Sequence, residues 1–496
     1  MNNISAKIYA NMLLLLLPVI VVLGYFLLQE TEIWHQIVVD DYLYVGLIPV
    51  TMVYFISLVL VQFNNNLFKD NISVPSVLFL AFMGYFIYLG TLDHYYQDQM
   101  GAKFVYNESI NAMYYYTMIS LSSWCFGYIS GCVSLDKLIH RKAAHKGLIK
   151  IRRWNKKRLK FLVLLFSLLG VVSFAIFYTV YIKGFPVLQG ISPNASAELR
   201  RIVSNEGHNV HLLAFNSMTM VLIYSAVYLI VFNNDLLIIL SFFVAVIAFS
   251  LWGARIYIAI PFLMFFPYLV KIKKYPLKKV VPIILSLVVL GSVYGTVRNL
   301  GFYAERKQEV PHANFVEKMA SLHIAPELRD SLGVVSYLDE LQEQYSAHAY
   351  LAGIYYTALP GKMLKLVGIN KQSLFDENGV GSGWLIAKVT RGYDWGGIRP
   401  GIMGQTLMAF GIMGVIFLFI AYGLLFSCLD RFSKCLEQFS PHIFLVYILS
   451  GLFSFSVIGT THSVFSKFWY LIYAFIVFYL FATKKQIVRC PCRDFS

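Results

Sequence analysis

Charge is scarce in this sequence. Asp, Glu, Lys and Arg together make up 14% of the 496 residues, whereas hydrophobic residues make up 58%. An average soluble domain carries about 25% charged residues, and no soluble core of this size buries so much apolar side chain. The low charge therefore excludes an ordinary soluble protein and indicates that a lipid bilayer is the main solvent of the chain.

Several signatures of soluble catalysts are also missing. The sequence has no Gly-x-x-x-x-Gly-Lys-Ser/Thr phosphate loop, which argues against ATP hydrolysis, and no His-Glu-x-x-His zinc motif. The acidic residues of the predicted external loops form no Asp-x-Asp pair, so we expect neither a metal nor an organic cofactor. The six cysteines all lie in predicted helices or cytoplasmic segments and indicate no external disulfide framework.

Long runs of apolar residues are the main feature of the sequence. About 20 apolar residues span a bilayer as a helix, and twelve runs reach that scale. They lie near residues 8–28, 42–63, 72–92, 110–135, 161–182, 210–232, 235–252, 255–270, 280–297, 402–428, 442–460 and 464–483. We predict an all-α polytopic membrane protein, a single transmembrane domain over residues 1–496. The first run is expected to be an uncleaved signal anchor, because no small-residue cleavage site follows it.

The positions of the basic residues predict how the chain is oriented in the membrane. Segment 136–160 holds eleven Lys or Arg residues against one Asp, segment 271–279 adds five lysines, and the tail after residue 483 adds four Lys or Arg residues against one Asp. Short basic loops stay in the cytoplasm, and twelve alternating spans put all three segments and both termini there. Nucleic-acid binding is not favoured, because these cations adjoin helix ends instead of forming a recognisable binding motif.

Two predicted external segments carry most of the polar information, 183–209 and 298–400. Loops as long as the second are uncommon in compact proteins and are usually functional. It contains eleven basic and eleven acidic residues, a mixture suited to binding a phosphorylated substrate while activating a hydroxyl. Val334, Leu338, Leu341 and Tyr345 recur at helical spacing and predict a short amphipathic helix lying on the membrane.

Arginines at predicted external helix ends are the strongest chemical signal. The positive-inside bias disfavours cations there, yet Arg255 lies in a short external turn and Arg298 at the end of an outward-going run. A guanidinium binds a phosphate or pyrophosphate through two parallel hydrogen bonds and keeps its charge. The alternative for any single arginine is that it extends harmlessly to the lipid headgroups.

Short fragments in a fixed order resemble a known family, the oligosaccharide repeat-unit polymerases (the Wzy family of O-antigen, capsule and common-antigen polymerases). The resemblance covers residues 183 onward. The fragments are Gly184–Leu188, Arg200-Arg201, Gly253–Ile258, Val297-Arg298, Leu328–Ser331, Ala358–Lys362, Arg399–Gly401 and Phe410–Gly414.

The resemblance implies a GT-C-type membrane glycosyltransferase of surface polysaccharide biosynthesis, such as lipopolysaccharide or capsule. It would move a growing glycan from undecaprenyl pyrophosphate to a sugar hydroxyl at the non-reducing end of a lipid-linked repeat unit, without a metal, at the periplasmic face of a bacterial inner membrane. The expected partners are the undecaprenyl-pyrophosphate-linked oligosaccharide, membrane lipid and a chain-length regulator protein, with no nucleic acid.

Residue roles follow from this hypothesis. The preferred pyrophosphate-binding residues are Arg255, Arg298 and Arg329, followed by Arg200, Arg201 and Arg399. The candidates for the base that activates the acceptor hydroxyl are Glu340, Asp330, His348 and Asp394, without a ranking among them. Trp384, Tyr393 and Trp395 are candidates for stacking on sugar rings, with loop packing or a membrane-interface belt as the alternative.

Two other functions stay open. A lipid-linked glycan ligase would use the same donor and differ in its acceptor. A transporter or flippase of lipid-linked oligosaccharide also fits many spans, but such proteins often have internal repeats and ionisable residues within the spans. The two halves of this chain differ, and its predicted spans are nearly free of charge.

Overall fold

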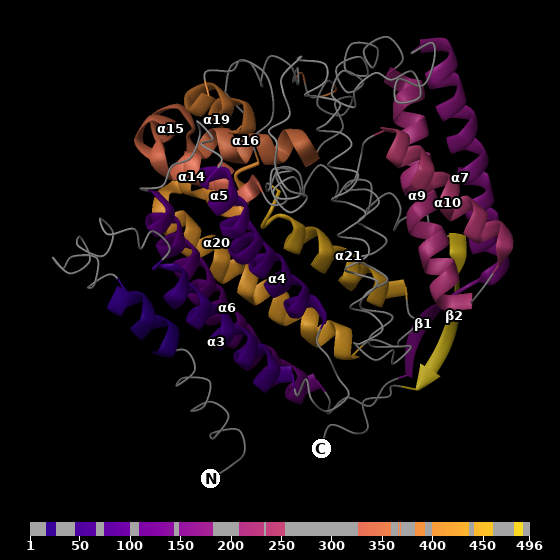
Figure 1. Ribbon diagram of the computed structural model, residues 1–496. Helices are drawn as coiled ribbons and strands as arrows, with labels where there is room; N and C mark the ends of the chain where they lie inside the picture. Colours follow the sequence, from indigo (N-terminus) through magenta and orange to yellow (C-terminus); the bar gives the residue numbers. More distant parts are fainter. Residues whose placement is uncertain are drawn as a thin grey trace. The chain divides into compact units, whose positions relative to one another are not determined.

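The computed structural model of the chain is predominantly helical (Figure 1). It describes residues 16–25, 45–65, 74–99, 109–142, 148–181, 208–232, 235–252, 326–358, 366, 368, 382–391, 399–435, 441–459 and 481–489. Within these residues, helices occupy nine of the twelve predicted apolar runs. The runs 255–270 and 280–297, and all but the end of 464–483, lie outside the described residues.

Four helical segments among the described residues are long and apolar enough to cross a membrane. They are Leu47–Asn64, Pro75–Tyr95, Lys156–Tyr181 and Gly401–Ser433. Large apolar side chains on them are exposed, for example Phe417 at 65% and Leu168 at 64%. Exposed apolar side chains on a long apolar helix are suited to contact with lipid. The chain therefore has the character of a helical membrane protein.

The chain divides into two compact units, each described here by itself. The first comprises residues 1–146, 323–435 and 449–469, and the second comprises residues 147–322, 436–448 and 470–496. One of the boundaries between the units, at residues 448 and 449, falls within helix α21 (Pro441–Phe455).

A bundle of long helices forms the body of the first unit (Figure 1). Its elements are α3 (Leu47–Asn65), α4 (Val74–Gly84), the π-helix η1 (Tyr85–Leu89), α5 (Gly90–Gln99), α6 (Ile110–Lys142) and α20 (Gly401–Cys435). Helices α6 and α20 lie side by side because glycines let their backbones meet. A Cβ atom on Gly423 would collide with the carbonyl oxygen of Trp124, and one on Gly127 with that of Ile420.

Both ends of this bundle are tied across the helices. Near the end of α20, Asp430 accepts hydrogen bonds from the Ser76 backbone N–H (3.1 Å) and hydroxyl (2.6 Å) and from the Tyr128 hydroxyl (2.7 Å). At the opposite end, Ser109 beside the start of α6 hydrogen-bonds Ser336 at 2.6 Å. The start of α6 and the start of α20 thus share one end of the bundle, and the start of α4 lies at the other.

Short helices form a layer over the end of the bundle at which α20 begins (Figure 1). They are α14 (Pro326–Ser336), α15 (Leu338–Gln344), α16 (Ala347–Ala358) and α19 (Ser382–Arg391). The layer is fastened where α20 kinks at Gly411, whose φ is +64°. The Gln342 side chain donates a hydrogen bond of 2.9 Å to the carbonyl oxygen of Leu407, four residues before the kink. This contact satisfies an acceptor that a continuous helix would have paired.

The layer corrects one expectation from the sequence. The predicted amphipathic helix is two helices, α14 and α15, that meet at Tyr337. Its apolar residues Val334, Leu341 and Tyr345 are fully buried in a core shared with α16, α19 and α20. Because a side chain without exposure cannot contact lipid, the prediction that this stripe lies on a membrane surface is wrong.

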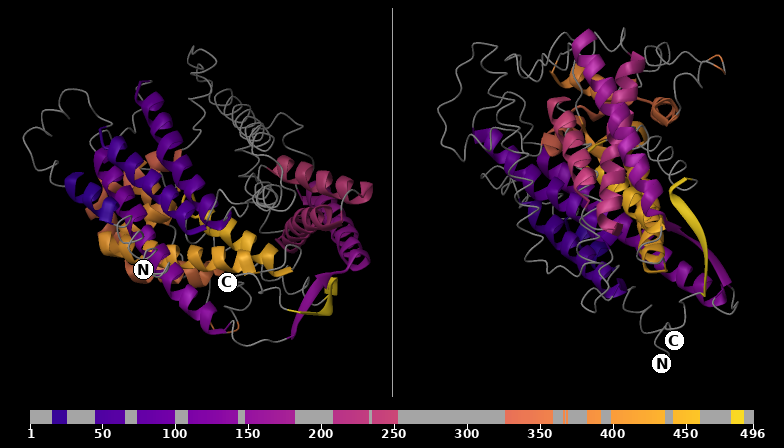
Figure 2. Two further views of the ribbon diagram at one scale, coloured as in Figure 1. Left: turned by 90° about the horizontal axis from the view of Figure 1, so that it is seen from below. Right: turned by 90° about the vertical axis from the view of Figure 1, so that its right-hand side faces the viewer.

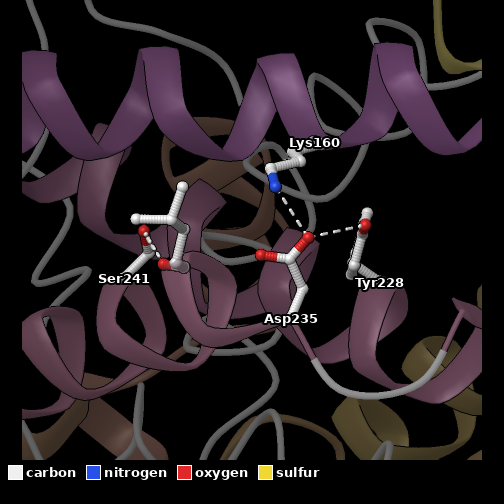
Figure 3. A network of polar contacts seen from close by, with 5 residues as sticks. Lys160, Tyr228, Asp235 and Ser241 are labelled. Atoms are coloured by element: carbon white, nitrogen blue, oxygen red, sulfur yellow. Dashed lines mark hydrogen bonds and ion pairs between the residues drawn. The ribbon is translucent and has the colours of Figure 1, made fainter.

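The described helices of the second unit are α7 (Lys156–Ile176), the π-helix η3 (Phe177–Tyr181), α9 (His208–Phe232) and α10 (Leu236–Trp252). Their core contains Phe174, Phe177 and Phe249. At the turn between α9 and α10, Asp235 accepts hydrogen bonds from Lys160 (2.7 Å) and the Tyr228 hydroxyl (3.1 Å) (Figure 3). This network joins the first turns of α7 to the connection between the other two helices.

A two-stranded ribbon in the second unit corrects another expectation. Residues 136–160 were predicted to be a basic loop, but α6 runs to Lys142, β1 (Leu148–Trp154) follows, and α7 begins at Lys156. Strand β1 pairs antiparallel with β2 (Thr483–Arg489) from the C-terminal tail (Figure 2). The segments 136–160 and 483–489, treated separately in the sequence, therefore form one structure.

Candidate functional site

Helix α14 brings charged side chains to the interface between the layer and the bundle. It begins at Pro326, a position where the missing proline N–H leaves no intrahelical bond unmade. Leu328 is buried against Gly90 of α5, where a Cβ atom would collide with the leucine side chain. Ser331 donates a hydrogen bond of 2.6 Å to the carbonyl oxygen of Pro400, just before α20. These contacts hold α14 between α5 and the start of α20.

Glu327, in the first turn of α14, is an acid of this interface whose pKa is shifted by its surroundings. Its side chain is buried, with the residue 8% exposed. Its pKa is raised to about 7, mainly by burial and also by the Asp330 and Asp93 carboxylates, while a backbone hydrogen bond and the Arg399 guanidinium oppose the rise. A carboxyl with a pKa near neutrality exchanges protons readily at physiological pH, as a general acid or base must.

Arg399 is exposed, and its guanidinium lies within electrostatic range of the Glu327 carboxyl. Its backbone N–H donates a hydrogen bond of 3.2 Å to an oxygen of Asp330. Gly401, two residues later, adopts a φ of +65°, and the Ile402 N–H donates to the carbonyl oxygen of Ser456 at 2.9 Å. A Cβ atom at Gly401 would collide with the Val457 carbonyl oxygen, so only glycine fits this turn. The backbone that carries Arg399 is thereby fixed next to α14.

Asp93 and His94 contribute two further ionisable groups that the sequence analysis did not select. Both are on α5 and are buried, at 2% and 0% exposure. The predicted span 72–92 stopped just before them, whereas the helix continues through them to Gln99. The signal that could have found them is their position: an Asp-His pair directly after an apolar run is either at the membrane surface or covered by protein. They follow η1, and π-helical turns are frequent at functional sites.

Arg329, a preferred pyrophosphate-binding residue in the sequence analysis, is placed differently from Arg399. It is 9% exposed, and its Nε is buried with no hydrogen-bond partner among the described residues. Residues two apart on a helix do not share a face, so the backbone of α14 directs Arg329 away from the side that Glu327 shares with Asp330. The structure thus brings Asp330 and Arg399 together and separates Arg329 from Glu327 on the helix.

Two other predicted base candidates, Glu340 and His348, are exposed in the layer. Glu340 is in the first turn of α15, and His348 is the second residue of α16. The buried hydrogen bonds of the layer instead join its helices to the bundle. Gln405 of α20 donates to the hydroxyls of Tyr345 (3.4 Å) and Ser382 (3.3 Å). Glu340 and His348 are thus exposed to solvent, whereas the carboxyl of Glu327 is buried.

The remaining predicted site residues lie outside the described residues. They are Arg200, Arg201, Arg255, Arg298, Tyr393, Asp394 and Trp395. Trp384 belongs to α19, but its side chain is not among those described. Their assignments stay predictions.

Comparison of the chain with protein-family models, with curated proteins and with solved structures found no match. Among the residues that the structure describes, no three or more His, Cys, Asp and Glu side chains gather in a way that could hold a metal ion. The site contains a buried acid with a pKa near 7, two further carboxylates and an exposed guanidinium.

Proposed function

We propose that this chain is a membrane glycosyltransferase, a polymerase that transfers a growing glycan from a lipid pyrophosphate to a hydroxyl of an incoming lipid-linked repeat unit. The single observation that carries the proposal is the neighbourhood of Glu327. A buried carboxyl with a pKa of about 7 lies within electrostatic reach of an exposed arginine, Arg399, in a layer of short helices over the bundle. Such a pair provides a proton acceptor and a cation in one place.

The reaction uses these two groups in defined roles. The acceptor hydroxyl oxygen attacks the anomeric carbon of the donor sugar while the bond from that carbon to the pyrophosphate oxygen breaks. Ionised Glu327 accepts the hydroxyl proton. The Arg399 guanidinium binds the departing pyrophosphate, on which negative charge accumulates as the bond breaks. Energy comes from the glycosyl pyrophosphate bond, so no nucleotide is consumed.

The helix arrangement supports the sidedness that this chemistry needs. The layer lies at the end of the bundle where α6 and α20 begin, and the alternating topology assigns both of these helix starts to the external face. The predicted topology has eight spans between β1 and β2 and so assigns both strands to the cytoplasmic side, and their pairing along their length is compatible with that assignment.

The proposal also covers the topology of the chain, its location and its substrate. Twelve spans, cytoplasmic termini, a bacterial inner membrane and a periplasmic active site follow from the run count and the basic segments. The resemblance to repeat-unit polymerases supplies the undecaprenyl-pyrophosphate-linked substrate and the absence of a metal requirement. A GT-C-type architecture is the finer fold class that it implies.

The test is reconstitution. Purified protein in lipid nanodiscs is incubated with a synthetic lipid-pyrophosphate repeat unit, and the products are separated by size. We expect a glycan ladder from the unmodified chain and its loss in Glu327→Gln, which keeps the size of the side chain. Glu343→Gln is the matched control, because Glu343 is an exposed acid of the same layer, and it should give the normal ladder.

Other outcomes separate the alternatives. Transfer of one intact glycan to a different lipid acceptor, without a ladder, would identify a ligase. Movement of lipid-linked oligosaccharide across proteoliposome membranes, with no new glycosidic bond, would identify a transporter. Either result would contradict the polymerase proposal.

A further inference from the structure

Arg329 of α14 is a buried arginine without an ion pair in the part of the chain that the structure describes. The residue is 9% exposed, and its Nε is buried with no hydrogen-bond partner among the described residues. Guanidinium groups remain cationic in proteins, and a cation taken out of water is costly unless an anion lies beside it. The surroundings of Arg329 therefore call for an anionic ligand.

The two acids nearest to Arg329 in the sequence are engaged elsewhere. Asp330 accepts a hydrogen bond of 3.2 Å from the Arg399 N–H. The pKa of Glu327 responds to burial, a backbone hydrogen bond, two carboxylates and the Arg399 guanidinium, and Arg329 is not among these influences. Arg329 also lies in the first turn of α14, where the positive end of the helix dipole disfavours a cation and favours an anion.

The side of α14 that carries Arg329 reaches the solvent. Residues seven apart on a helix lie on the same side, about two turns from each other, and this spacing puts Ser336 in line with Arg329. Ser336 is exposed, and its hydroxyl hydrogen-bonds that of Ser109 at 2.6 Å. Hydroxyl groups both donate and accept hydrogen bonds, as sugar hydroxyls do. This side of α14 thus offers a ligand one cation and a pair of hydroxyl groups.

The anion for Arg329 differs from the pyrophosphate assigned to Arg399. Residues two apart on a helix do not share a face, and a helix with its side chains is about 10–12 Å across. Glu327 and Arg399 belong to the other side of α14. If the reacting hydroxyl is at Glu327, the anion at Arg329 must belong to another part of the same glycan.

A carboxylate on a sugar fits these constraints. A guanidinium and a carboxylate are both planar and form two parallel hydrogen bonds. The pyrophosphate of an acceptor is attached at the opposite end of its repeat unit from the hydroxyl that reacts, so it is not the group near α14. A neutral sugar would leave the buried cation uncompensated.

We propose that the side of α14 with Arg329 and Ser336 binds the carboxylate of an acidic sugar, so that the glycan bound by this chain is acidic. Arg329 pairs with the carboxylate, and the hydroxyls of Ser336 and Ser109 bond hydroxyl groups of the same glycan. This role differs from the pyrophosphate binding predicted for Arg329 from the sequence. The inference rests on the proposed function, because that proposal supplies a glycan as the ligand.

A binding measurement tests this without turnover. The full-length protein in nanodiscs is titrated with methyl glucuronide or with methyl glucoside, which differ only in the carboxylate, and dissociation constants are obtained by calorimetry at constant ionic strength. We expect the glucuronide to bind at least about tenfold more tightly, the usual gain from hydrogen bonds to a charged group. A glucuronide that binds the unmodified chain no more tightly than the glucoside would overturn the proposal.

Matched variants locate the preference. Arg329→Gln should bind both sugars with similar affinity, and Arg329→Lys should keep part of the preference because it retains the charge without the planar fork. Lys388→Gln removes an exposed cation from α19 in the same layer and should keep the full preference. An unchanged preference in Arg329→Gln would contradict the assignment.

Inorganic pyrophosphate distinguishes the two anions. In excess, at the same ionic strength, it should leave the preference for the glucuronide intact. If it abolishes the preference, Arg329 binds pyrophosphate and the acidic-sugar proposal is wrong.

Failure of this inference can be told apart from failure of the proposed function. Absence of a glycan ladder together with an Arg329-dependent preference would contradict the polymerase proposal alone, because a ligase or transporter of acidic glycans would bind the same sugar. A ladder without any preference for the carboxylate would contradict the acidic-sugar inference alone.

Discussion

In the helical layer of the first unit, Glu327 is buried near two carboxylates and one guanidinium. In the two-stranded ribbon of β1 and β2 in the second unit, Arg153 and Lys484 are exposed and stand opposite each other in the strand register. Burial converts the first set of charges into a proton-exchanging group, because a desolvated carboxylate resists ionisation until the pH is near 7. The comparison teaches that burial changes the protonation of an ionisable group, as it does at Glu327, because it removes the water that stabilises the charged form.

The largest difference between the two regions should appear in catalysis. We expect Glu327→Gln to lower the rate of chain extension by about 10²-fold to 10⁴-fold, the usual contribution of a general acid or base. Arg153→Gln should leave the extension rate nearly unchanged. The measurement is the initial rate of ladder formation at pH 7.5 with equal amounts of folded protein. Equal rates for the two variants would remove the functional distinction between the regions.

Asp330 provides a sharper test within the layer, because the sequence made it a candidate base. Asp330→Asn keeps an oxygen that can accept from the Arg399 N–H but removes the charge that raises the pKa of Glu327. The acidic limb of the pH–rate profile should therefore move to lower pH, with the rate at high pH maintained. If Asp330 is the base instead, the variant should be inactive at every pH.

The fastening of the layer should affect stability more moderately. Gln342→Ala removes the donor to the Leu407 carbonyl oxygen next to the kink in α20. The bond is part-buried and Gln342 is exposed, so we expect the free energy of unfolding to fall by about 0.5–1.5 kcal/mol, the usual net contribution of a hydrogen bond. Thermal or denaturant unfolding in detergent checks this value, and the exposed neighbour Glu343→Gln serves as the control.

The smallest effect is expected at the ion pair between Lys160 and Asp235. The hydrogen bond from Lys160 lowers the pKa of Asp235. A carboxyl with a lowered folded-state pKa contributes stability above its unfolded pKa, and that contribution disappears as the pH falls through the folded value. Both side chains are partly exposed, at 34% and 17%, so the contribution is about 0–1 kcal/mol. Lys160→Met should therefore reduce the dependence of stability on pH below about 4. A pH series of unfolding measurements tests this.

The sequence predicted the helices well and the local departures from them poorly. Bilayer thickness fixes the length of an apolar run, so the runs that became α3, α7, α9 and α10 could be located from hydropathy alone. Gln342, which bonds the Leu407 carbonyl oxygen beside the kink at Gly411, lies 69 residues before that kink, and the pairing of β1 with β2 joins segments from distant parts of the chain. Contacts of this kind leave no pattern in a short window of sequence.

The candidate site was predicted in part for a related reason. Asp330 and Arg399 were selected by residue type and order, and the structure joins them through a hydrogen bond. Glu327 was counted only as one of eleven acids of its loop, because its burial arises from helices α5 and α14 packing together. Asp93 and His94 were missed because a hydropathy window ends where charge begins.

The pH dependence of chain extension tests the central claim most directly. With purified protein in nanodiscs and a saturating lipid-pyrophosphate repeat unit, the rate should rise about tenfold per pH unit at low pH and level off above about pH 7. Glu327→Gln should show a low rate without that rise. A Glu327→Gln variant with the normal rate and the normal pH profile would contradict the claim that this carboxyl accepts the proton.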